Sequence, residues 1–82
     1  MSTSSVRETV ARIWSEVLGT GIDEESDFFL LGGHSLLATQ MVARLEAALG
    51  VKVTMREVLE YPEFGEFADL VAERADTDRT PA

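Results

Sequence analysis

One serine of this 82-residue chain stands where its side chain could do chemistry. Ser35 follows Gly32, Gly33 and His34, and an apolar pattern with helical spacing begins directly after it. Glycine tolerates backbone angles that other residues avoid, so the pair can end the preceding loop in a tight turn. At a helix start, free backbone N–H groups and the helix dipole favour an anion. The run therefore predicts one exposed hydroxyl that can carry a phosphate.

Catalysis by Ser35 is the first alternative, because His34 stands next to it. The nucleophile elbow of serine hydrolases needs Gly-x-Ser-x-Gly, but Leu37 occupies the place of the second glycine and no strand precedes the motif. Adjacent residues rarely place an imidazole nitrogen against the neighbouring hydroxyl, and no third orienting group is evident. One histidine without any cysteine argues against zinc, and the acidic stretch 23–27 lacks the spacing of an EF-hand. We expect a non-catalytic chain without a metal.

A purely structural role is the second alternative. Serine is a favoured N-cap residue, so Ser35 could simply begin a helix in an unmodified docking module. The wider pattern favours modification, and it consists of Asp27-Phe28-Phe29, the run from Leu31 to Leu37, Gln40, Leu45 and Tyr61-Pro62. With these residues the chain resembles peptidyl carrier proteins, the thiolation domains of nonribosomal peptide synthetases, from about Val6 to Ala75.

The resemblance implies a covalent cofactor. A phosphopantetheinyl transferase would use coenzyme A to attach 4′-phosphopantetheine to Ser35, with Gly33, His34 and Leu36 as flanking or docking residues. The thiol of this cofactor would be the nucleophile that a chain without cysteine lacks. An adenylation domain would then load an aminoacyl or aryl group as a thioester for condensation, epimerisation or thioesterase domains. Acyl carrier proteins of the fatty-acid or polyketide type are the alternative, but they usually have aspartate before the serine, so His34 favours the peptidyl class.

The elements that must position Ser35 are predicted to be helices. We expect an all-α, four-helix bundle of three main helices and one short helix, with a long first loop. A capping box from Ser5 to Glu8 begins the first helix, which ends before Gly19. The second helix is expected over residues 35–49, the short one over about 55–61 behind a second capping box, and the last over 63–75.

Apolar residues at helical spacing predict the core. The expected inward side chains are Val6, Val10, Ile13, Trp14, Val17, Leu37, Ala38, Met41, Val42, Leu45, Ala48, Leu49, Val58, Leu59, Phe64, Phe67, Ala68, Leu70 and Val71. In the loop, we expect Ile22, Leu31 and one phenylalanine of the Phe28/Phe29 pair to attach the segment to the core. Leu36 is expected to point outward on a docking surface, with Met41 or Met55 near it.

Length, charge and hydropathy limit the number of domains, the partners and the location of the chain. Residues 1–82 are expected to form a single domain with an ordered core of about 5–75 and a linker-like tail over 76–82. A net charge of −8 argues against nucleic acid as a partner, and the segment 28–56 is the least acidic part. Every apolar run falls well short of the roughly 20 residues of a membrane span, so we expect a cytoplasmic protein. We also expect a monomer. The sequence does not identify the carried acyl group.

Overall fold

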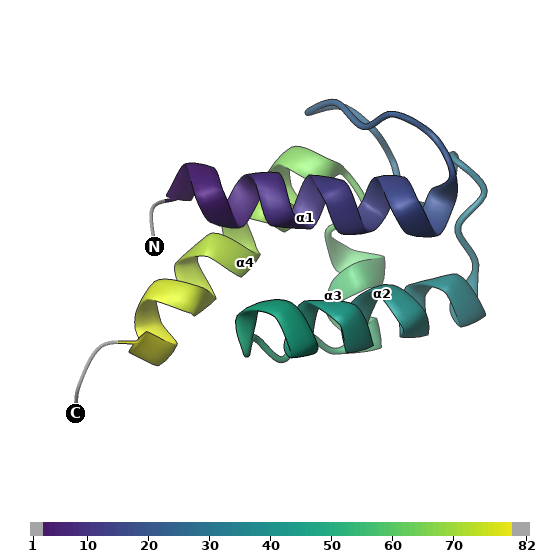
Figure 1. Cartoon of the computed structure of the whole chain (residues 1–82). Helices are drawn as coiled ribbons and strands as arrows, with labels where there is room; N and C mark the ends of the chain where they lie inside the picture. Colours follow the sequence, from purple (N-terminus) through teal and green to yellow (C-terminus); the bar gives the residue numbers. More distant parts are fainter. Residues whose placement is uncertain (1–2, 80–82) are drawn as a thin grey trace.

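Four helices make up the described part of the chain. This computed structural model describes the backbone of residues 3–79 and the side chains of residues 5–76. The helices are α1 (Thr3–Leu18), α2 (Ser35–Leu49), α3 (Met55–Glu60) and α4 (Phe64–Arg79). α1 packs against α2 and α4, α3 packs against α2, and Figure 1 shows α1 and α2 running in opposite directions. The predicted all-α fold with a long first loop is confirmed.

Left-handed glycines end the first two helices. Gly19 (φ +72°) donates to the Ser15 carbonyl at 2.7 Å, and Gly50 (φ +69°) donates to the Glu46 carbonyl at 2.8 Å. Glycine adopts this conformation without the penalty that a Cβ brings, which is why it is common directly after a helix. The predicted bounds of the second helix are therefore confirmed.

Two other helix ends differ from the prediction. α1 begins at Thr3, so Ser5 lies inside its first turn instead of at its cap. α4 continues to Arg79, which makes 76–79 of the predicted linker-like tail helical, while residues 80–82 lie outside the described residues. In both places glycine and proline are absent, and adding one residue to an existing helix costs far less than starting one.

The core surrounds Trp14, which is fully buried. Its ring meets Phe28 and Phe64 edge to face, at centroid distances of 5.1 and 5.4 Å, and lies 5.4 Å from Phe67. Such aromatic pairs add about 0.5–1.5 kcal/mol each beyond the area that they bury. The indole N–H finds no acceptor among the described residues. The loop residue Phe28 is thus part of the same core as residues of all four helices.

Three expected core residues lie elsewhere. Leu59 is 63% exposed, Ala48 is exposed, and Leu70 is only half-buried. The reason is geometric, because neighbouring helix residues differ by about 100° in direction and a short or peripheral helix buries only a narrow stripe. α3 buries Val58, and its neighbour Leu59 then faces solvent. The loop attachments are confirmed for Ile22 and Phe28, and Phe29 packs against the core as well, whereas Leu31 is half-buried.

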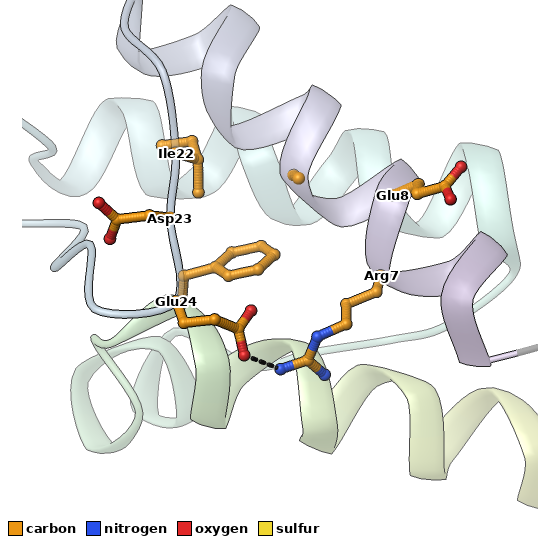
Figure 2. A pocket seen from close by; sticks show the side chains of 7 residues that line it. Arg7, Glu8, Ile22, Asp23 and Glu24 are labelled. Carbon is orange, nitrogen blue, oxygen red and sulfur yellow. Dashed lines mark hydrogen bonds and ion pairs between the residues drawn. The ribbon is translucent and has the colours of Figure 1, made fainter.

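Hydrogen bonds from Arg7 attach the acidic part of the first loop to α1 and α4. Its guanidinium donates to Glu24 at 2.5 Å and to Asp69 of α4 at 2.6 Å, and these hydrogen bonds raise the pKa of Arg7. Figure 2 shows Arg7 reaching from α1 toward Glu24 across a surface pocket of about 480 Å³. Gly65 of α4 also lets the loop lie close to the helix, since a Cβ there would be only 3.1 Å from the Glu24 carbonyl oxygen.

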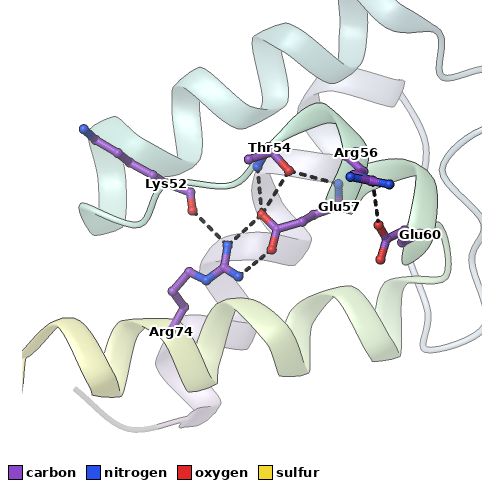
Figure 3. Close-up of polar contacts among 6 residues, drawn as sticks. All are labelled: Lys52, Thr54, Arg56, Glu57, Glu60 and Arg74. Carbon is purple, nitrogen blue, oxygen red and sulfur yellow. Dashed lines mark hydrogen bonds and ion pairs between the residues drawn. The ribbon is translucent and has the colours of Figure 1, made fainter.

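α3 begins with the predicted capping box. Glu57 N–H donates to Thr54 Oγ1 at 3.1 Å, and Thr54 N–H donates to Glu57 Oε1 at 2.9 Å. The Glu57 carboxylate also accepts from both terminal nitrogens of Arg74, a residue of α4 (Figure 3). The hydrogen bonds from Arg74, and then that from the Thr54 backbone, lower the pKa of Glu57 from 4.5 to about 2.

This pKa predicts a loss of stability in acid. Between pH 4.5 and about 2, Glu57 is protonated in the unfolded chain but still ionised in the folded protein. The free energy of unfolding therefore falls as the pH falls through this window. The Glu57→Gln side chain does not titrate in this range. We therefore expect the free energy of unfolding of this variant to fall over the window by about 2 kcal/mol less than that of the wild type.

Denaturant titrations at several pH values between 7 and 2.5 measure this difference. Glu60→Gln is the matched control, because Glu60 lies on the same helix and its carboxylate is 54% exposed beside Arg56. An equal decline in all three proteins would contradict the role given to Glu57.

Candidate functional site

The turn before α2 is built by Asp27. Its Oδ1 accepts from the backbone N–H groups of Phe29 and Leu30 at 2.9 and 3.0 Å, and its carbonyl accepts from Leu31 at 3.0 Å. Aspartate favours such turns because its short side chain reaches the backbone two and three residues ahead. Phe28 N–H donates to the Pro62 carbonyl at 2.8 Å, which attaches this turn to the segment before α4.

The two glycines before His34 have different roles. Gly32 has a φ of +100°, which a residue with a side chain rarely adopts. Gly33 lies against Phe28: a Cβ on it would be 2.3 Å from Cδ1 of the phenyl ring and 2.5 Å from the Phe28 carbonyl oxygen. The Gly33 N–H donates to that carbonyl at 2.9 Å. Sequence reasoning predicted the turn but missed this close approach, since the pattern does not reveal which side chain passes under the backbone.

Ser35 is the first residue of α2, and the N-cap is His34. The extended backbone of His34 begins the helix without a hydrogen bond from its side chain. The interpretation of Ser35 as an N-cap is therefore wrong. Ser35 is exposed, and its hydroxyl makes no hydrogen bond to any described residue. Because this side chain does not hold the helix, it is available for modification.

The start of α2 suits an anionic group. The first hydrogen bond of the helix runs from Ala38 N–H to the His34 carbonyl at 2.8 Å, and the N–H groups of residues 35–37 have no acceptor within the described chain. The first turn contains no acidic residue, although the whole chain has a net charge of −8. Unpaired N–H groups and the helix dipole stabilise a negative charge at this place. A phosphodiester on Ser35 would place its negative charge close to these N–H groups.

The surroundings of Ser35 are only partly as expected. His34 is exposed, and Leu36 is 62% exposed and points away from the core as predicted. Met41 is fully buried in the core, so its expected place near a docking surface is wrong. Met55 is half-buried, and its sulfur lies 3.9 Å from Thr39 Oγ1 on α2.

Other kinds of site receive no support from the described residues. Among them, no group of three or more histidine, cysteine, aspartate or glutamate side chains could hold a metal ion. No helix within the same residues is long and apolar enough to cross a membrane. His34 and Ser35 share no hydrogen bond and line none of the three surface pockets described for residues 5–76.

Comparison with known proteins agrees with this geometry. A family model described as the phosphopantetheine attachment site matches residues 8–71. The chain belongs to this family. Its cofactor is 4′-phosphopantetheine, and the chain is a carrier domain, as its resemblance to peptidyl carrier proteins predicted.

Curated members similar to the chain are much longer proteins. A linear gramicidin synthase polypeptide of Brevibacillus parabrevis is 46% identical over 68 residues, which are 82% of this chain and 1% of that protein. Bassianolide nonribosomal cyclodepsipeptide synthetase of Beauveria bassiana is 48% identical over 54 residues, which are 66% of this chain and 2% of that protein. The attachment domain thus spans a small fraction of the curated relatives that it matches.

Solved structures confirm the carrier-protein fold. One is a chain from the structure of the phosphopantetheine transferase Sfp in complex with coenzyme A and a peptidyl carrier protein, with a TM-score of 0.79 and 33% identity over 84% of this chain and 91% of that one. The solution structure of an active-site mutant peptidyl carrier protein also gives a TM-score of 0.79, with 32% identity over 87% of this chain and 80% of that one.

The contact between Gly33 and Phe28 predicts the cost of adding one methyl group. Gly33→Ala would force the Phe28 ring or the turn to move, and we expect the free energy of unfolding to fall by about 3 kcal/mol. Gly21→Ala is the control, because nothing lies within 4 Å of a Cβ there, and we expect a change within about 0.5 kcal/mol. Denaturant unfolding of the two variants measures this, and equal stabilities would show that the contact does not constrain the turn.

Proposed function

We propose that Ser35 is the residue that receives 4′-phosphopantetheine and that the carrier domain serves nonribosomal peptide synthesis. The observation that carries this proposal is the exposed, unbonded hydroxyl of Ser35 at the first position of α2. It is supported by the similar structure in which a peptidyl carrier protein is bound together with a transferase and coenzyme A. Gly33 sets the turn, and His34 and Leu36 flank the hydroxyl on the exposed side.

In this role the chain supplies position and no catalysis. When bound, the cofactor supplies a thiol that can hold an aminoacyl or peptidyl group as a thioester. The domain would present this group to adenylation, condensation and thioesterase domains, an assignment supported by the synthetases among its relatives. Tethering raises the effective concentration of the group at each partner, and each contact must be weak enough to release the domain again.

Modification by a transferase tests the proposal directly. The protein is incubated with coenzyme A and a broad-range phosphopantetheinyl transferase, and its intact mass is measured. We expect the wild type to gain the mass of one 4′-phosphopantetheinyl group and Ser35→Ala to gain none. Ser15→Ala removes a hydroxyl from α1 and should be modified like the wild type. His34→Ala should also be modified, because the His34 side chain makes no hydrogen bond to the helix start that presents Ser35.

Two results would overturn the proposal. One is an unchanged mass of the wild type under conditions that modify another carrier protein. The other is an equal gain on Ser35→Ala, which would place the cofactor on a different residue.

A further inference from the structure

α3 is too short to hold its own orientation. It has six residues, and Val58 is its only fully buried side chain. Isolated helices shorter than about 12–15 residues are marginal in water, so tertiary contacts must fix the position of this one. On one side it packs against α2, where the Met55 sulfur lies 3.9 Å from Thr39 Oγ1.

Arg74 of α4 provides the fixation on the other side. Its Nη1 donates to Glu57 Oε1 at 2.8 Å and to the Lys52 carbonyl at 3.1 Å, and its Nη2 donates to Glu57 Oε2. Figure 3 shows the guanidinium pointing from α4 to both groups, one inside α3 and one in the segment that leads into it. A planar guanidinium that binds both carboxylate oxygens fixes direction as well as distance.

Arg74 lies in a strongly acidic part of the chain. Between residues 57 and 78 the chain contains eight acidic residues, and Arg74 is the only lysine or arginine. The side chains of Arg74 and Glu57 are 32% and 20% exposed, which protects the pair from much of the screening that weakens surface ion pairs. By contrast, Arg56 and Glu60 of α3 pair at 3.3 Å with Arg56 87% exposed.

The position of α3 matters because it extends the exposed apolar surface beside Ser35. Leu36 and Thr39 are three residues apart on α2 and therefore share one side of it. Thr39 touches Met55, and Leu59 lies four residues after Met55 on the same side of α3. Leu36 and Leu59 are 62% and 63% exposed, so each of the two packed helices presents one leucine to solvent, that of α2 directly after Ser35.

We propose that Arg74 is a positioning residue for partner recognition: through Glu57 and the Lys52 carbonyl it holds α3 so that Leu59 and Leu36 form one surface, which the transferase that modifies Ser35 binds. The inference rests on the proposed function. Arg74 touches neither Ser35 nor the reacting groups, so its loss weakens binding of the carrier domain without slowing the chemical step.

Arg74→Gln and Arg56→Gln form a matched pair, since each removes one positive charge that pairs with a glutamate of α3. Amide exchange comes first. We expect Arg74→Gln to speed exchange of the amides of residues 58–61 by about tenfold or more, and Arg56→Gln to change it by less than about threefold. Amides in the middle of α2 should exchange alike in both variants.

Initial rates of modification, measured against carrier concentration, form the second arm. We expect Arg74→Gln to raise KM by about fivefold or more with kcat within about twofold of the wild type, and Arg56→Gln to leave both unchanged. Leu59→Ala should raise KM as well. Combined with Arg74→Gln it should add little, because a helix without a fixed position no longer presents Leu59.

Arg74→Lys keeps the charge but lacks the two-pronged guanidinium, and it covers the case in which Arg74→Gln fails to fold. A KM raised in Arg74→Lys supports the proposal, and a KM equal to that of the wild type overturns it. Faster exchange in α3 with an unchanged KM also overturns it, as does unchanged exchange. If the wild type is not modified at all, the proposed function fails, while the exchange arm still decides whether Arg74 holds α3.

Discussion

The contact between the Phe28 ring and the backbone of Gly33 determines where the second helix begins. Phe28 is buried against Trp14 in the centre of the core, and the chain passes over it so closely that a single added carbon would collide with it. The loop is attached on both sides of this ring, by the Asp27 turn and by the bond from Phe28 to Pro62. A long loop that would otherwise be a flexible connection is thereby fixed at the residue before His34.

In this arrangement the residues that fix the start of α2 are not the residue that offers the hydroxyl. Because packing under Gly33 fixes the helix start, neither His34 nor Ser35 uses its side chain to cap the helix. The hydroxyl and the first three N–H groups of α2 remain available to a phosphate. The acidic residues that give the chain its charge lie in the first loop and on α3 and α4, where Arg7 and Arg74 bind several of them. A negatively charged domain can thus keep one position suited to an anion.

The sequence predicted the features that depend on local chemistry. Gly50, the Thr54–Glu57 capping box and the apolar spacing of α2 each specify an element through neighbours within four residues. The predictions that failed depend on tertiary surroundings. Leu59 and Ala48 have apolar side chains at plausible core positions, but no other element covers them. Residues 76–79 continue α4, since neither glycine nor proline stands among them. The Arg74–Glu57 pair joins residues 17 positions apart on different helices, and a one-dimensional pattern does not reveal it.

Hydrogen exchange at the Ala38 amide tests most directly whether the loop, and not the serine, holds the start of α2. This amide makes the first hydrogen bond of the helix, and Leu45 in the middle of α2 provides the reference. The account predicts that Ser35→Ala leaves the protection of Ala38 within about threefold of the wild type, while Phe28→Leu lowers it by about tenfold or more relative to Leu45. Loss of protection in Ser35→Ala as large as that in Phe28→Leu would contradict it, because the serine side chain would then be needed to hold the helix.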